Sequence, residues 1–116
     1  ALRLALLNVL DNAAKFTPPK GDIIVKMYSQ QGFLEISVTN SFEKLAEEDL
    51  TRIFDPFHRT GRSKAAGSGL GLTITKKIIE RHGGKIESFN SPEGLEIRIR
   101  LPEGAMGSNL YGLLLK

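Results

Sequence analysis

The chain has 116 residues, 41% of them hydrophobic and 25% charged, and a net charge of +3. This composition is ordinary for one globular domain with a packed core. The chain has no cysteine, which excludes disulfides and thiolate metal sites. No apolar run approaches the roughly 20 residues of a membrane span, and no secretory signal is visible. We therefore expect a cytoplasmic domain that makes no membrane contact.

The basic pI of about 9.3 raises the possibility of nucleic-acid binding. The basic residues are scattered, however, and the densest group, Arg59, Arg62 and Lys64, lies in a predicted loop. The sequence has no recognition helix and no platform of alternating aromatic and basic residues. We therefore expect no nucleic-acid partner.

The first half of the chain predicts a helix followed by a β-hairpin. Apolar residues recur at helical spacing from residue 2 to about 16, and Pro18 and Pro19 end that helix. Residues 22–28 are rich in β-branched side chains, and residues 33–40 alternate apolar with polar ones. The short link between the two runs predicts an antiparallel hairpin.

The second half predicts two helices and a second hairpin. Residues 46–53 form a short helix limited by Pro56, residues 60–69 a glycine-rich loop, and residues 70 to about 81 a long helix that Gly83 and Gly84 end. Residues 85–89 and 95–101 are strand-like. The expected fold class is α+β, a two-layer sandwich with a mixed, mostly antiparallel sheet covered on one face by helices.

The first predicted helix carries an unusual polar stripe. Asn8, Asn12 and Lys15 share one helical face, and Phe16 flanks it. A solvent-facing edge completed by Asp11 is one interpretation, although such an edge normally uses Glu, Lys or Gln. The other interpretation is a ligand site, because amide oxygens can coordinate Mg²⁺ and lysine attracts phosphate.

A glycine-rich turn, residues 67–72, leads directly into the second long helix. Glycines allow a ligand close to the backbone, and helix N-termini bind phosphate. A bare flexible loop is the alternative, since no strand precedes the turn and the lysine of a P-loop is absent.

Four segments in order resemble the motifs of sensor histidine kinases. Residues 8–18 resemble the N box, 53–59 the F box, 67–72 the second glycine box, and 82–86 the segment that follows it. The resemblance runs from about residue 2 to 102 and implies the Bergerat, or GHKL, ATPase fold. It assigns residues 1–103 to an ATP-binding catalytic domain.

The resemblance also implies roles for individual residues. Asn12 would bind Mg²⁺ directly and Asn8 would support the ion, while Lys15 would contact phosphate oxygens. Phe16 would pack on adenine, and Arg59 would lie near the γ-phosphate. The residues from about 41 to 68 would form the ATP lid. The remaining nucleotide contacts would come from Gly67, Gly69, Leu70, Gly71 and Thr73.

One motif departs from the family pattern. Where the family has Asp-x-Gly-x-Gly after the second strand, this chain has Asn40-Ser41-Phe42-Glu43-Lys44. Asn40 keeps an acceptor oxygen for the adenine amine. Phe42 and Lys44, however, bring side chains to positions where the family's backbone lies against the nucleotide.

The function implied is that of a phosphoryl donor. The chain would bind Mg²⁺ and ATP or ADP and pass the γ-phosphoryl to a histidine on a separate dimerisation and histidine-phosphotransfer domain, with a response regulator as further partner. His58 and His82 are not expected to accept it, so the chain alone should transfer little. The alternatives are a degenerate module kept for interaction, and another GHKL ATPase or an anti-sigma-type serine kinase.

Residues 104–116 fall outside the domain pattern. Residues 104–108 resemble a cloning or protease-site remnant, so we expect 104–116 to be a linker or tail of foreign origin. Residues 109–116 are nevertheless apolar enough to pack as an added strand.

Overall fold

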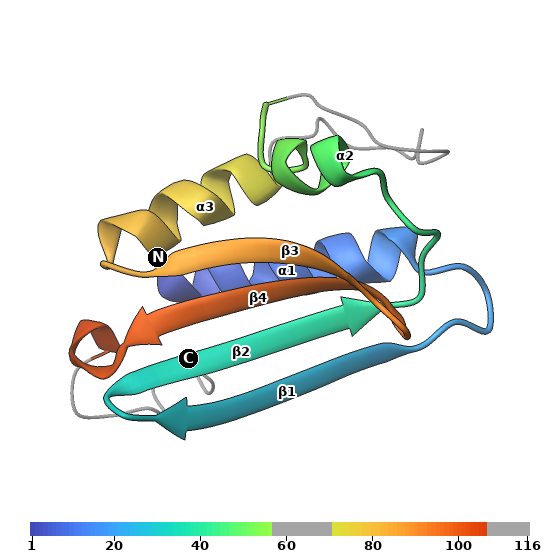
Figure 1. Cartoon of the computed structure of the whole chain (residues 1–116). Coiled ribbons are helices and arrows are strands. Elements are labelled where there is room, and N and C mark those ends of the chain that lie inside the picture. The colour runs from blue at the N-terminus through green and yellow to red at the C-terminus, as the bar shows by residue number, and fades with distance from the viewer. Residues whose placement is uncertain (57–70, 107–116) are drawn as a thin grey trace.

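The computed structural model of the chain describes residues 1–56 and 71–106, which form one sheet and its covering helices (Figure 1). The fold class predicted from the sequence is confirmed. No helix in the described ranges is long and apolar enough to cross a membrane. The elements are α1 (Leu2–Phe16), β1 (Ile23–Gln30), β2 (Phe33–Asn40), α2 (Glu47–Arg52), α3 (Gly71–Arg81), β3 (Lys85–Ser91), β4 (Gly94–Pro102) and the 3₁₀ helix η1 (Glu103–Met106).

The sheet has the strand order β1-β2-β4-β3, and the three pairings among these strands are antiparallel. The central pair, β2 and β4, joins two hairpins that lie far apart in the sequence. Its register sets Leu34 opposite Leu101 and Ile36 opposite Ile99, and all four side chains are almost completely buried. This confirms the alternation predicted for both strands.

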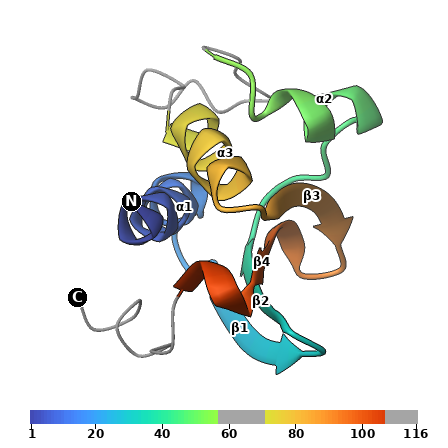
Figure 2. The same ribbon diagram turned by 90° about the vertical axis from the view of Figure 1, so that its left-hand side faces the viewer.

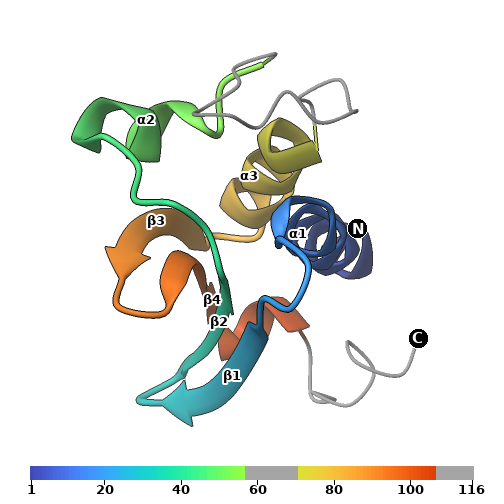
Figure 3. The ribbon, with the colours of Figure 1, turned by 90° about the vertical axis from the view of Figure 1, so that its right-hand side faces the viewer.

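Helices α1 and α3 pack side by side on one face of the sheet, as Figures 2 and 3 show. The buried Thr75 hydroxyl of α3 lies 2.9 Å from the Gly71 carbonyl oxygen and 3.3 Å from the Ala5 carbonyl oxygen of α1. Because Ala5 is small and completely buried, the two helix backbones can approach closely here. This seam fixes the position of α3 along α1.

The opposite face of the sheet carries the polar residues of the predicted alternation, but not all of them are exposed to solvent. Ser37 and Thr39 of β2 are buried, although they point away from the helices. The reason is cover from neighbouring strands: Glu96 accepts a hydrogen bond from Ser37 at 3.0 Å and pairs with Arg98, whose guanidinium lies over the Phe89 ring. The hydrogen bond from Arg98 to the Glu96 carboxylate raises the pKa of the guanidinium.

The end of α3 shows why this chain needs two glycines before β3. Gly83 has a φ of 76°, a conformation that favours glycine, and ends the helix. The next residue, Gly84, packs against β4, where an added Cβ would lie 2.5 Å from the Arg100 carbonyl oxygen. His82 Nδ1 lies 2.8 Å from the Ile78 carbonyl oxygen, in keeping with the structural role expected for this histidine.

We predict that Gly84→Ala destabilises the fold by about 1–3 kcal/mol, because its methyl group must displace strand backbone. Urea unfolding monitored by circular dichroism measures this change. Gly104→Ala is the matched control, since a Cβ there meets no atom within 4 Å. Equal stabilities of the two variants would contradict the prediction.

Candidate functional site

The polar stripe of α1 faces the start of α3. Asn8 and Asn12 are both partly buried, and the Asn8 Nδ2 donates a hydrogen bond to the Gly71 carbonyl oxygen at 3.4 Å. These two residues are 63 positions apart in the sequence. The structure therefore brings two predicted phosphate-binding motifs together, the N box and the end of the second glycine box.

The donor set on α1 fits a magnesium ion held together with phosphate. Asn12 is partly buried on the same helix, and its side chain carries an amide oxygen of the kind that can coordinate Mg²⁺. No group of three His, Asp or Glu side chains that could hold a metal occurs within residues 1–56 and 71–106. An ion here would depend on amide oxygen, phosphate oxygens and water; Mg²⁺ usually keeps several waters and takes few protein ligands beside substrate phosphates.

Lys15 lies on the same stripe and pairs with Asp11 at 3.2 Å. Both side chains are at least half exposed, so the pair contributes only about 0–1 kcal/mol. Such a weak ion pair leaves the ammonium group free to move to a phosphate oxygen, which would offer a stronger charge.

The described part of the F box is anchored to α3. Ile53 and Phe54 are buried, and the Thr73 hydroxyl donates a hydrogen bond to the Phe54 carbonyl oxygen at 2.8 Å. The structure thus ties Thr73, expected near the base, to the chain that follows α2. The other predicted site residues here lie outside the described residues: Arg59, Gly67, Gly69 and Leu70, together with His58.

Hydrogen bonds hold both ends of the segment that contains the altered first glycine box. Ser41 and Asp22 exchange two hydrogen bonds of 2.9 Å, one through the Ser41 backbone N–H and one through its hydroxyl oxygen. Three residues on, Leu45 is buried, and the Asn90 side chain bonds to both its N–H (3.0 Å) and its carbonyl (2.8 Å). These contacts hold the backbone on either side of Phe42 and Lys44, the positions where the family pattern has glycines.

Asn40 lies at the end of β2, almost completely buried at 2% exposure. Its Nδ2 donates a hydrogen bond to the Ser41 carbonyl oxygen at 3.2 Å, which fixes the orientation of the amide. Gly94 packs against its backbone: a Cβ on Gly94 would lie 2.0 Å from the Asn40 carbonyl oxygen, and the φ of Gly94 is 137°. Only glycine fits at position 94 without moving Asn40.

Phe16, predicted to pack on adenine, contacts an aromatic ring of the chain itself. The Phe16 and Phe42 rings meet edge to face, with centroids 6.4 Å apart and an interplanar angle of 81°. Such a pair is worth about 0.5–1.5 kcal/mol beyond the area it buries. A base that stacks on Phe16 would have to share or displace this contact.

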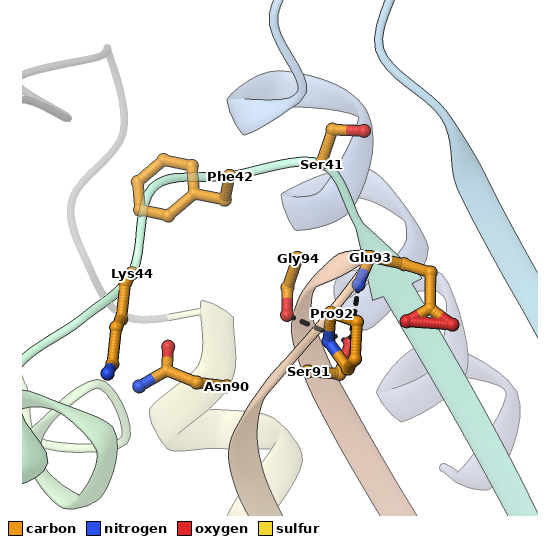
Figure 4. Close-up of a pocket in the computed structure, with 8 residues that line it drawn as sticks. All are labelled: Ser41, Phe42, Lys44, Asn90, Ser91, Pro92, Glu93 and Gly94. Carbon is orange, nitrogen blue, oxygen red and sulfur yellow. Dashed lines mark hydrogen bonds between the residues drawn. The ribbon is translucent and has the colours of Figure 1, made fainter.

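A pocket of about 530 Å³ lies beside the altered box, between it and the β3–β4 turn. In Figure 4 the Lys44 and Asn90 side chains lie next to each other on one side, and Ser91, Pro92 and Glu93 lie on the other. The volume suits a small molecule. None of its lining residues comes from α1, but Phe42, which lines it, contacts Phe16 beside the asparagine stripe.

Sequence reasoning missed the residues that brace this region, namely Ser41, Asn90 and Gly94. Gly94 carried a usable signal, because a Ser-Pro-Glu-Gly run between two strands predicts a tight turn. Asn90 carried none, since its partner Leu45 lies 45 residues away.

Comparison with known proteins identifies the family. Residues 1–105 match the family described as histidine kinase-, DNA gyrase B-, and HSP90-like ATPase. The chain belongs to this family.

Two sensor histidine kinases are similar to most of the chain. It is 38% identical over 105 residues to the sensor histidine kinase CusS of Escherichia coli O157:H7, covering 88% of the chain and 22% of CusS. The mycobacterial sensor histidine kinase MprB has a TM-score of 0.79 at 35% identity, covering 85% of this chain and 70% of MprB. The chain is the histidine-kinase type of ATP-binding catalytic domain.

A third similar structure is a kinase in complex with a nucleotide analogue. The full-length kinase ShkA, solved in complex with AMPPNP, has a TM-score of 0.74 at 29% identity over 87% of this chain and 21% of ShkA. The chain spans only about a tenth to about a fifth of the length of the curated relatives it matches.

We predict that Asn90→Ala destabilises the domain by about 1–3 kcal/mol, because both the N–H and the carbonyl of Leu45 lose their partner. Urea unfolding measures the stability, and hydrogen exchange of the Leu45 amide locates the loss. Lys44→Ala, an exposed change in the same segment, is the control and should leave both unchanged. An unchanged rate of hydrogen exchange at the Leu45 amide in Asn90→Ala would contradict the view that Asn90 holds this backbone.

Proposed function

We propose that this domain binds Mg²⁺ and ATP and serves as the phosphoryl donor of a sensor histidine kinase. The observation that carries the proposal is the contact between Asn8 and Gly71, which joins the N box to the start of α3. Amide groups, a movable lysine and a helix N-terminus then converge on one region, which suits the phosphates of a nucleotide.

The residues divide the task by their chemistry. The Asn12 oxygen holds the ion and Asn8 supports it, while Lys15 leaves Asp11 to neutralise phosphate oxygens. Magnesium supplies charge neutralisation of the phosphates during transfer. The contribution of the chain is positioning and electrostatics. Gly67, Gly69 and Gly71 line the phosphates, with Arg59 near the γ-phosphoryl group.

The base site in this proposal combines Asn40, Phe16 and Thr73. The buried Asn40 amide has its nitrogen engaged by the Ser41 carbonyl, which leaves the amide oxygen as the acceptor for the adenine amine. The acceptor histidine and a response regulator belong to other domains and partners. The catalytic domain comprises residues 1–103, and residues 104–116 follow it as a C-terminal tail.

We predict metal-dependent ATP binding that Asn12→Ala weakens about tenfold or more, because loss of one amide ligand costs about 1.4 kcal/mol or more. Calorimetric titration of ATP and ADP, with Mg²⁺ and with EDTA, measures the affinities. Arg3→Ala, an exposed change on the same helix, is the control. Equal ATP affinity of Asn12→Ala and wild type would refute the assignment of Asn12.

A second candidate function is a degenerate module in which nucleotide binding is weak and the fold serves interaction. The observation that favours it is the Phe16–Phe42 contact, since the ring that should receive adenine is already engaged. The braced 41–45 segment adds to it, because a fixed backbone adapts less to a ligand.

The two candidates differ in what Phe42→Gly does. If Phe42 competes with the base, its removal raises ATP affinity by up to about tenfold, the equivalent of the roughly 0.5–1.5 kcal/mol of an aromatic pair. Phe42→Leu, which keeps apolar bulk, is the matched variant, and urea unfolding verifies that both are folded. Absence of ATP binding in the wild type and a gain in Phe42→Gly favour the degenerate module. Tight binding in the wild type that Phe42→Gly leaves unchanged rules it out.

A further inference from the structure

An apolar surface is exposed on α1 and on β1, the edge strand of the sheet. Its members, which we call the β1 flank, are Leu7 and Leu10 of α1 and Ile23 and Val25 of β1. Their exposed fractions are 50%, 39%, 43% and 52%, high values for large apolar side chains. Covering these half-exposed side chains would remove further apolar area from water, which favours a cover for this surface.

The geometry places these side chains around one open corner. Val25 pairs with the buried Val38, so it projects toward the helix-covered face, and Ile23 projects the same way two residues earlier. On α1, Leu10 lies two residues from Asn8 and therefore on the flank away from α3. Figures 2 and 3 show β1 at the edge of the sheet, on the far side of α1 from α3.

The outer edge of β1 is also open. Among the described strands β1 pairs only with β2, so its other side presents backbone N–H and C=O groups. An exposed strand edge with apolar side chains is a template for another strand. The occupant should thus be an extended apolar segment that supplies both backbone hydrogen bonds and aliphatic side chains.

We propose that the occupant is the C-terminal segment of this chain, residues 109–116, added antiparallel to β1. Its sequence, Asn-Leu-Tyr-Gly-Leu-Leu-Leu-Lys, is apolar and carries one charged side chain. The last described element, η1, begins beside the C-terminal end of β1. The Glu103 backbone N–H donates to the Gly32 carbonyl oxygen at 2.9 Å, and the Ser29 hydroxyl bonds to the Glu103 carboxylate.

Length and direction follow from this anchor. Since η1 begins beside the turn that ends β1, a segment returning along the edge runs from the Gln30 end toward Ile23. Ten extended residues after η1 span roughly 33 Å, whereas the eight residues of β1 span roughly 26 Å. The segment is long enough to cover the whole edge without strain.

The absence of cysteine makes a directional test possible. In the full chain, a nitroxide on Lys116→Cys should broaden the NMR amide signals of Ile23 and Ile24 more than those of Ser29 and Gln30. A nitroxide on Gly107→Cys should do the reverse. The double change Leu113→Asp, Leu114→Asp, which puts charges at two of the apolar positions of the segment, should abolish the broadening from position 116.

Two results would overturn the proposal. One is a position-116 label that leaves the start of β1 unbroadened, which means that the segment does not dock there. The other is broadening of these signals in ¹⁵N chain that carries no nitroxide, when it is mixed with nitroxide-labelled chain that lacks ¹⁵N. That result means that a second copy covers the β1 flank.

Discussion

The pairing of β2 with β4 is the constraint on which the rest of this domain depends. It joins two hairpins into one sheet and stacks Leu34, Ile36 and their partners into the layer that both long helices cover. The same register ends with Asn40 opposite Leu95, next to Gly94. Because the core fixes this register, it also fixes the position of the buried Asn40 amide. The packing of the core therefore also determines the position of Asn40.

The seam between α1 and α3 makes the second half of the site. Thr75 bridges to Ala5 inside the seam, and Asn8 reaches Gly71 at its outer edge. Small residues at the contact allow the backbones to approach, so a polar stripe on one helix can face the N-terminal end of the other. A larger residue than Ala5 would separate the asparagines from α3 without touching either of them. The positions of Asn8 and Asn12 thus depend on residues that have no chemistry of their own.

The sequence predicted what is local and failed where partners are distant. The bounds of α1 agree with prediction at both ends, because apolar periodicity and two prolines define them within the segment itself. The burial of Ser37 and the bracing of Leu45 escaped prediction, because Glu96 and Asn90 come from the other hairpin. The asparagine stripe was visible as a helical pattern. The meeting of Phe16 with Phe42 was not, since it depends on how the 41–45 segment folds back toward α1.

The altered glycine box is best understood by comparing magnitudes. A micromolar nucleotide site corresponds to about 8 kcal/mol of binding free energy. The Phe16–Phe42 contact is worth about 0.5–1.5 kcal/mol beyond its buried area, so breaking it changes affinity by up to about tenfold and cannot by itself abolish binding. The two Asn90 hydrogen bonds hold the backbone of Leu45 and do not involve α1. In the proposed site, the replacement of both family glycines would therefore tune the base end and leave the asparagine–lysine end intact.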